Sequence, residues 1–180
     1  DVIANAAVPG KSQLLLFVEM EKTKNFGSSL IRDTLNKYDY EDPREKAFLK
    51  RLTEGTLESL LTLDYVINAY SKTPTNKMKP LIRSLLRLSV YQILYMDTVP
   101  DSAACNEAVR LAKKKGFERL SGFVNGVLRT ITRNKEEILN SESAFWQELQ
   151  KNPVQALSVR YSVPEWMISL WEEIGRASCR

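Results

Sequence analysis

The sequence predicts an all-α protein, a bundle of helices arranged around one buried central helix. When residues 81–96 are placed on a helix, apolar side chains cover almost the whole circumference, and Arg83 and Arg87 occupy the one clearly polar edge. The segments on either side repeat apolar residues every three or four positions, and no run alternates with the period of a β-strand. The central stretch is too short and too charged to span a bilayer, so we expect it to be the core of the bundle.

The chain is expected to begin with a loose tail over residues 1–11, because Pro9-Gly10 breaks regular structure. A first helix is expected over residues 12–24, and a second, shorter one over residues 30–38.

A third helical stretch is predicted to start at Pro43, since proline is preformed for the first helical position and the acids before it favour the positive end of the helix dipole. Its apolar stripe continues as far as Tyr70. Gly55 interrupts the stripe, which indicates either a point of close packing or a kink. Residues 72–76 are expected to connect this stretch to the central helix.

Two helices are expected after the central one. The first has Asp101 or Ser102 as its cap and ends at Lys115, where glycine follows a run of three lysines. The second spans residues 117–133, and its two glycines, Gly122 and Gly126, are expected to mark a close contact between helices.

Four polar residues in these helices are assigned structural roles. Asn106 and Glu107 lie in mid-helix beside a face of alanines, and we favour hydrogen bonds to the ends of neighbouring helices over ligand binding, because buried polar groups usually serve structure. Gln92 and Asn125 are placed in the same structural class.

The chain changes character after residue 140. Residues 141–174 contain all three tryptophans in short helical pieces separated by prolines, which indicates an appendage folded onto a neighbour, and residues 175–180 are expected to fray. The predicted organisation is therefore a helical domain over residues 12–140, followed by this appendage.

The composition offers little for catalysis. The chain has no histidine, which excludes histidine-based triads and zinc sites of the HExxH type, and its glycines form no phosphate-binding loop. Cys105 and Cys179 are far apart and unlike a disulfide framework, which suits a reducing compartment such as the cytoplasm. No metal site and no membrane span are expected.

The positive charge is concentrated in one segment. Residues 113–135 hold seven of the 26 basic residues and one of the 22 acidic ones, so the rest of the chain is slightly acidic. Such a patch is typical of a nucleic-acid binder, although lysines that offset a helix dipole on a solvated face would give the same pattern. Arg129 and Arg133, one helical turn apart, suit successive phosphates or, equally, helix-end carbonyls and acids.

Several segments resemble the NusB family in order and spacing. They are LLRLSVYQILYMD (85–97), AACNEAV (103–109) and GFVNGVLR (122–129). REKAF (44–48) and RYSVPEW (160–166) extend the resemblance, which is closest to the N-terminal NusB-like domain of bacterial small-subunit ribosomal RNA cytosine-5 methyltransferases of the RsmB/Sun type.

The resemblance implies an all-α fold of two packed helical sub-bundles that engages ribosomal RNA. It also implies that an S-adenosylmethionine-binding methyltransferase domain follows, so residues 141–174 would lead into it, and that the present chain holds no cofactor and methylates nothing by itself. Neither cysteine lies in the Pro-Cys context of the family's nucleophile. The family's own methyltransferase domain or a ribosomal protein are the implied protein partners.

The RNA contact is expected in the basic segment. Stand-alone NusB proteins contact RNA through an arginine-rich first helix, whereas residues 11–24 here contain lysines but no arginine. The predicted RNA-binding residues are therefore Lys113, Lys114, Lys115, Arg119, Arg129 and Arg133. The alternatives are a protein-interaction module in which the basic patch is incidental, and a transcription antitermination factor.

Overall fold

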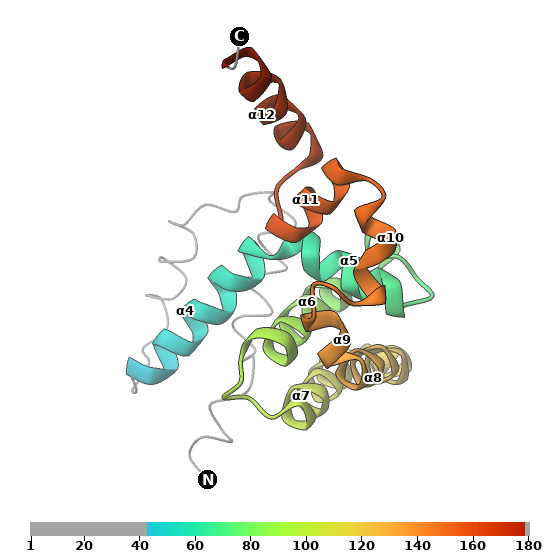
Figure 1. The fold of residues 1–180 in the computed structure, drawn as a ribbon. Helices are drawn as coiled ribbons and strands as arrows, with labels where there is room; N and C mark the ends of the chain where they lie inside the picture. Colours follow the sequence, from blue (N-terminus) through green and yellow to red (C-terminus); the bar gives the residue numbers. More distant parts are fainter. Residues whose placement is uncertain (1–42, 179–180) are drawn as a thin grey trace.

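The computed structural model describes residues 43–178, and within this range every regular element is a helix (Figure 1). The prediction of an all-α fold is confirmed. The tail expected over residues 1–11 and the helices expected over 12–24 and 30–38 lie outside the described residues. The elements are α4 (Pro43–Glu58), α5 (Leu60–Tyr70), a short 3-10 helix η1 (Thr75–Lys77), α6 (Pro80–Tyr95), α7 (Asp101–Lys114), α8 (Glu118–Arg133), α9 (Lys135–Leu139), α10 (Ala144–Gln150), α11 (Pro153–Tyr161) and α12 (Glu165–Ser178).

Helix α6 is the centre of the bundle. It packs against α4, α5, α7, α8 and α9 and lies in the middle of the view in Figure 1. Eleven of its 16 residues are buried, and Leu85, Leu86 and Leu88 have no exposed surface. The prediction of a buried central helix is confirmed. The helix begins at Pro80, whose ring holds the backbone in helical geometry at the first position.

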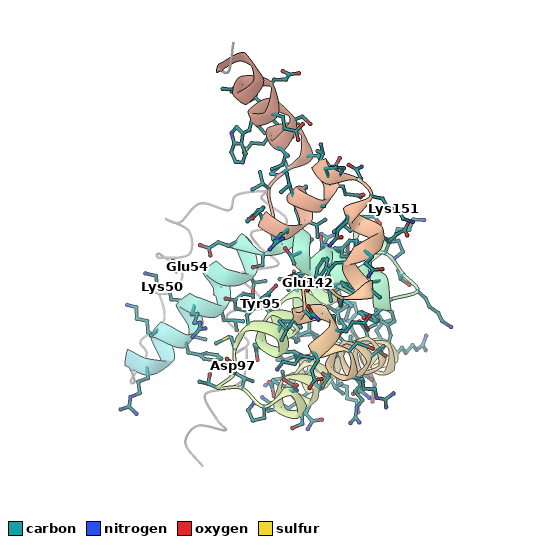
Figure 2. All side chains as sticks on the ribbon, in the orientation of Figure 1. Lys50, Glu54, Tyr95, Asp97, Glu142 and Lys151 are labelled. Atoms are coloured by element: carbon teal, nitrogen blue, oxygen red, sulfur yellow. The ribbon has the colours of Figure 1, made fainter. Side chains whose placement is uncertain are left out.

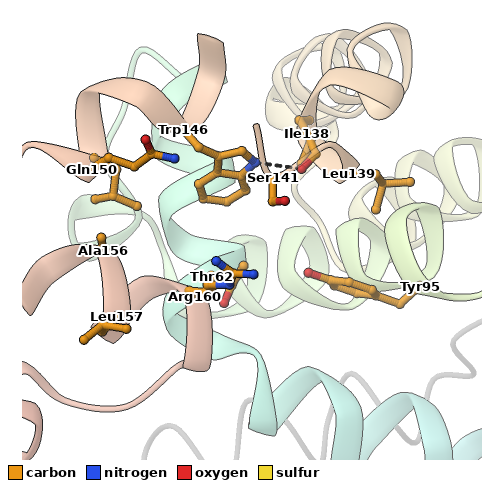
Figure 3. A pocket seen from close by; sticks show the side chains of 11 residues that line it. Thr62, Tyr95, Ile138, Leu139, Ser141, Trp146, Gln150, Ala156, Leu157 and Arg160 are labelled. Atoms are coloured by element: carbon orange, nitrogen blue, oxygen red, sulfur yellow. Dashed lines mark hydrogen bonds between the residues drawn. The ribbon is translucent and has the colours of Figure 1, made fainter. Parts of the chain in front are cut away.

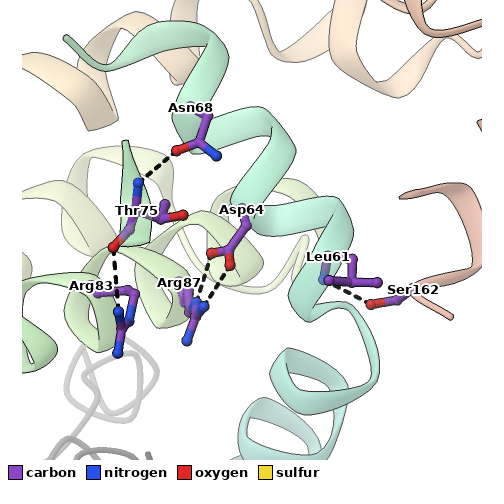
Figure 4. Close-up of polar contacts among 7 residues, drawn as sticks. All are labelled: Leu61, Asp64, Asn68, Thr75, Arg83, Arg87 and Ser162. Carbon is purple, nitrogen blue, oxygen red and sulfur yellow. Dashed lines mark hydrogen bonds and ion pairs between the residues drawn. The ribbon is translucent and has the colours of Figure 1, made fainter. Parts of the chain in front are cut away.

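The polar edge of α6 is tied to α5 and η1 (Figure 4). Arg87 donates from Nε and Nη2 to the two carboxylate oxygens of Asp64, at 2.7 and 2.5 Å. Arg83 donates to the backbone carbonyl of Thr75 at 3.4 Å, and the Thr75 amide donates to Asn68 Oδ1 at 2.7 Å. A bidentate arginine–carboxylate pair adds geometric specificity to its energy, so these contacts determine how α5 lies on α6.

Gly55 is a point of close packing between α4 and α6. A Cβ atom added at Gly55 would lie 1.9 Å from Oη of Tyr91. Helix α4 continues past the glycine to Glu58, and Ser59 alone separates it from α5. Of the two interpretations of this glycine, close packing is confirmed, because the Tyr91 ring of α6 lies directly against the Gly55 backbone.

Helices α7 and α8 form an antiparallel hairpin (Figure 1). The turn is a Schellman motif: Gly116 has φ of +80°, and the amide of Phe117 donates to the carbonyl of Ala112 at 2.9 Å. The predicted stop at Lys115 and Gly116 is confirmed. The predicted caps of α7 are wrong, because the N-cap residue is Pro100 and neither Asp101 nor Ser102 caps the first amides with its side chain.

The C-terminal segment packs on α5. In α10, Trp146 stacks on Tyr65 with ring centroids 5.5 Å apart, and Phe145 stacks on Tyr70 at 5.6 Å. Further along, Ser162 Oγ accepts a hydrogen bond from the Leu61 amide at 2.9 Å, which caps the start of α5 from a residue far away in the sequence (Figure 4). The expectation of an appendage folded onto a neighbour agrees with this packing.

Helix α12 leaves an apolar surface exposed. It extends through Gly175 to Ser178, beyond the end expected at residue 174, because a single glycine costs only about 1 kcal/mol inside a helix. Trp166, Trp171 and Ile174 are 65%, 54% and 57% exposed. None of the helices within residues 43–178 is long and apolar enough to cross a membrane.

Candidate nucleic-acid interface

The basic residues predicted to bind RNA all lie on the α7–α8 hairpin. Five of the six are exposed and one, Lys115, is half-buried. Among residues 43–178 none of the six forms an ion pair, so their charges are available to an external anion. They are Lys113 and Lys114 at the end of α7, Lys115 in the turn, Arg119 in the first turn of α8, and Arg129 and Arg133 near its end.

The hairpin separates these residues into two groups. Lys113, Lys114, Lys115 and Arg119 surround the turn and are called the turn cluster. Arg129 and Arg133 form the arginine pair at the other end of α8. At a rise of 1.5 Å per residue, Arg119 is about 15 to 21 Å from the arginine pair along the helix, so a ligand that contacts both groups must be extended.

The outward face of α8 connects the two groups. At 100° per residue, Gly122 and Gly126 lie between Arg119 and the arginine pair, opposite the buried stripe formed by Val124, Val127, Leu128 and Ile131. Within residues 43–178, a Cβ atom added at either glycine would have no atom of another helix within 4 Å. The expected close helix contact at these glycines is therefore wrong, since the buried stripe, and not the small residues, faces the bundle.

Asn125 orients one of the two arginines. Its Oδ1 accepts a hydrogen bond from Arg129 Nε at 3.0 Å, one helical turn away. Within the described residues neither Arg129 nor Arg133 pairs with an acid or a helix-end carbonyl, so the structural alternative for the arginine pair is not realised there.

Among residues 43–178, neither Asn106 nor Glu107 bonds to the end of a neighbouring helix, so that expectation is wrong for the described helices. Glu107 is 6% exposed, and its carboxylate accepts two hydrogen bonds from Arg110 of the same helix at 2.6 and 2.7 Å. A buried carboxylate needs a cation, and the arginine one turn further on supplies it. Asn106 is exposed and faces the arginine pair across a hollow.

Gln92 is buried and has no hydrogen-bond partner in the part of the chain that the structure describes. It has no exposed surface, and both Oε1 and Nε2 lack partners there. A buried, unsatisfied amide costs free energy, because the unfolded state hydrates it. Gln92 thus occupies the core of α6 but binds none of the described helix ends.

Replacement of Gln92 by methionine is expected to raise the free energy of unfolding by about 1 kcal/mol, because the side chain keeps a similar shape and loses the unsatisfied amide. Denaturant unfolding of the whole chain measures this change in the free energy of unfolding. The matched control is Gln147→Met at an exposed position of α10, expected to change stability by less than about 0.5 kcal/mol. A marked loss of stability in Gln92→Met would show that the amide makes a stabilising contact in solution.

The described residues hold no arrangement for catalysis at the hairpin. Cys105 is buried, and its Sγ lies 3.9 Å from Thr132 Oγ1. Burial raises the pKa of the Cys105 thiol, so the neutral thiol, a poor nucleophile, dominates at neutral pH. No group of three or more Cys, Asp or Glu side chains within residues 43–178 is placed to hold a metal ion.

A second hollow lies between α6, α9, α10 and α11 (Figure 3). It has a volume of about 260 Å³, and Tyr95, Leu139, Trp146 and Leu157 give it a largely apolar lining. Arg160 is its one charged residue, so it offers no acid–base pair. It is suited to apolar contact and not to a reaction.

A comparison with known protein families matches the NusB family model to residues 12–133. The chain belongs to the NusB family. The region matched includes α6 and the α7–α8 hairpin. All six basic residues therefore lie within a NusB-family domain.

Two curated relatives of this NusB-family chain are named as probable ribosomal RNA small subunit methyltransferase B. The protein from Bacillus subtilis is 34% identical over 156 residues, which cover 87% of this chain and 33% of the relative. The protein from Synechocystis is 32% identical over 162 residues, which cover 88% of this chain and 34% of the relative. The chain therefore spans about a third of the length of these relatives.

Other relatives are named transcription antitermination protein NusB. The protein from Thermodesulfovibrio yellowstonii is 36% identical over 108 residues, 59% of this chain and 70% of the relative. The family model ends at residue 133, before the last quarter of the chain, so a match that covers 87% must continue beyond it. The likeness to the methyltransferases thus includes part of the segment that follows α8.

Proposed function

We propose that this chain is the RNA-engaging, non-catalytic NusB-like domain of an S-adenosylmethionine-dependent small-subunit ribosomal RNA cytosine-5 methyltransferase. The observation that carries the proposal is the basic α7–α8 hairpin, whose six cations are free of ion pairs within the described residues. Unpaired cations along one exposed element are the electrostatic footprint of a nucleic-acid contact. Catalysis and cofactor binding would belong to the further part that the methyltransferase relatives possess.

The bare outward face of α8 supports RNA as the ligand. Between Arg119 and the arginine pair, the two glycines leave the helix backbone uncovered, so a sugar–phosphate strand can approach it closely. Arginine contacts to phosphates position a strand without reading its sequence. The proposal therefore assigns to this domain affinity for RNA and its orientation, and leaves the choice of base to the methyltransferase part.

The segment after residue 140 supports the methyltransferase context over that of an antitermination factor. The similarity to the methyltransferases extends past the family model. The exposed tryptophans of α12 form the kind of apolar surface that is normally covered by protein. We propose that the methyltransferase part of the parent protein, or a ribosomal protein, covers it, and that the protein works in the cytoplasm.

RNA binding measured against salt concentration tests the proposed function. With a labelled fragment of small-subunit ribosomal RNA, the wild-type affinity is expected to fall steeply as salt rises, because bound phosphates have released their counterions. The triple variant K113Q/K114Q/K115Q is expected to lower the slope of log affinity against log salt by roughly 2 to 3.

The control removes three charges elsewhere. Lys50 on α4 and Lys151 directly after α10 lie away from the hairpin (Figure 2), and Lys72 follows α5. The variant K50Q/K72Q/K151Q is expected to keep the wild-type slope. If the slope of log affinity against log salt falls by the same amount in both triple variants, the contact is diffuse charge attraction and the α7–α8 hairpin is not the interface.

A further inference from the structure

A polar hollow lies where the start of α7 meets the end of α8. Its volume is about 210 Å³, far more than the roughly 10–15 Å³ that one water molecule requires. On the α7–α8 hairpin, the hollow lies beside the arginine pair and away from the turn cluster. Its lining consists of Asp101, Ser102, Cys105, Asn106, Arg129, Thr132 and Arg133.

Two guanidinium groups supply positive charge to this hollow. Arg129 uses Nε for Asn125, which holds the side chain in place and leaves its terminal nitrogens for another acceptor. Among residues 43–178, Arg133 has neither an ion pair nor a hydrogen bond from its side chain. The fork of donors on each guanidinium matches the oxygens of a phosphate group.

Uncharged donors complete the lining from the side of α7. Ser102 and Asn106 are exposed and donate to nothing within the described residues. The first main-chain bonds of α7 are made by the amides of Ala103 and Ala104 to Pro100, so the amides before them have no helical partner and no side-chain cap. The positive end of the helix dipole adds to the two arginines.

The groups that could oppose an anion are neutralised. The Asp101 carboxylate is engaged by Lys135, whose Nζ lies 3.1 Å from Oδ1. The Cys105 thiol carries no charge near neutral pH, because burial raises its pKa. The hollow therefore has a positive balance of charge although it contains one carboxylate.

We propose that this hollow binds a backbone phosphate of the RNA, with Arg129 and Arg133 clamping the phosphate from α8 and Ser102 and Asn106 donating hydrogen bonds from α7. The inference rests on the proposed function and specifies its anchoring point. The phosphate seated here orients the strand, and the outward face of α8 leads the strand from this anchor toward the turn cluster.

The decisive variant is Ser102→Glu, which places a carboxylate at the mouth of the hollow. An acid in the first turn of a helix favours the helix dipole, so the melting temperature is expected to stay the same or rise. RNA affinity is expected to fall about five- to ten-fold, because the carboxylate repels the phosphate and competes for the arginines. Arg133→Gln is expected to weaken binding by a similar factor.

The matched control is Ser141→Glu, an exposed serine between α9 and α10 that does not line this hollow, and it is expected to bind RNA nearly as the wild type does. On addition of RNA, the side-chain amide resonance of Asn106 is expected to shift in the wild type and not in Ser102→Glu. If the wild type binds RNA and Ser102→Glu binds equally well, the hollow is not the anchor, although the proposed function stands.

Inorganic phosphate distinguishes the source of the anion. In a titration followed by the Asn106 resonance, a backbone-phosphate site is expected to bind free phosphate weakly and to bind RNA far more tightly. If Ser102→Glu abolishes phosphate binding and leaves RNA affinity unchanged, the hollow is a site for free phosphate and the RNA assignment is overturned. If the wild type binds no RNA, the proposed function and the anchor fall together.

Discussion

Replacement of Gly55 by alanine is expected to lower the free energy of unfolding by about 2 to 3 kcal/mol, the cost of forcing extra volume into a packed contact. The new Cβ atom would lie 1.9 Å from Tyr91 Oη and 2.2 Å from Cζ, so the end of the ring must move. Such a movement disturbs the packing of the ring, because Tyr91 is 9% exposed and packs against Tyr95 with ring centroids 5.2 Å apart.

The same substitution at Gly126 is the control. No atom of another described helix would lie within 4 Å of its Cβ, so Gly126→Ala is expected to raise stability by about 0.5 to 1 kcal/mol through helix propensity alone. Denaturant unfolding of both variants is expected to show changes of opposite sign in the free energy of unfolding. In the background of Tyr91→Ala, Gly55→Ala is expected to lose most of its cost, because the clashing ring is gone. An unchanged cost in that background would show that Tyr91 is not the cause.

Replacement of Asp64 by asparagine is expected to lower the free energy of unfolding by about 2 kcal/mol. The side chains of Arg87 and Asp64 are 11% and 21% exposed, so the pair is largely desolvated. The substitution removes the negative charge and one of the two oxygens that face a poorly solvated guanidinium, a loss that reaches 3–5 kcal/mol when burial is complete and the charge has no other partner. The residual exposure of both groups reduces that figure here.

The control for this pair is the exposed pair between Lys50 and Glu54 on α4 (Figure 2), whose side chains are 61% and 41% exposed. Glu54→Gln is expected to change stability by less than about 0.5 kcal/mol, since exposed pairs contribute little. If Asp64→Asn costs no more than Glu54→Gln in denaturant unfolding, the pair does not hold α5 on α6.

The helices were predictable because the patterns that produce them are local. The apolar circumference of residues 81–96 marks a helix with neighbours on every side, and α6 has them. The stop at Gly116 was predictable for a similar reason: a lysine run followed by glycine satisfies the end of a helix within one turn.

The faces of α8 show where the prediction went wrong although the information was present. Gly122 and Gly126 were interpreted by their size as a contact surface, whereas their angular position places them opposite the buried stripe and on the side of Arg129 and Arg133. A small residue permits close approach by any neighbour. In a helix with a strong apolar stripe, that neighbour comes from outside the bundle.

The hollow beside the arginine pair could not be predicted from residue types. Thr132 gave no signal in the sequence and Ser102 only that of a possible helix cap. They line one site because α7 and α8 run antiparallel, so that the start of one meets the end of the other. The turn at Gly116 makes that arrangement foreseeable in outline. Which side chains then face the same space depends on how the two helices rotate against each other.

The sequence by itself determined the helices, the buried position of α6, the family and the concentration of positive charge in one segment. All of these follow from spacings of three or four residues and from motifs along a continuous stretch. Only the tertiary structure decided which polar groups come together: Asp64 bonds to Arg87, the Leu61 amide bonds to Ser162, and the arginine pair lines the same hollow as Ser102. The physical reason is that the periodicity of a helix depends on residues close together in the sequence. A contact between distant side chains depends instead on how whole helices pack, and no single segment determines that packing.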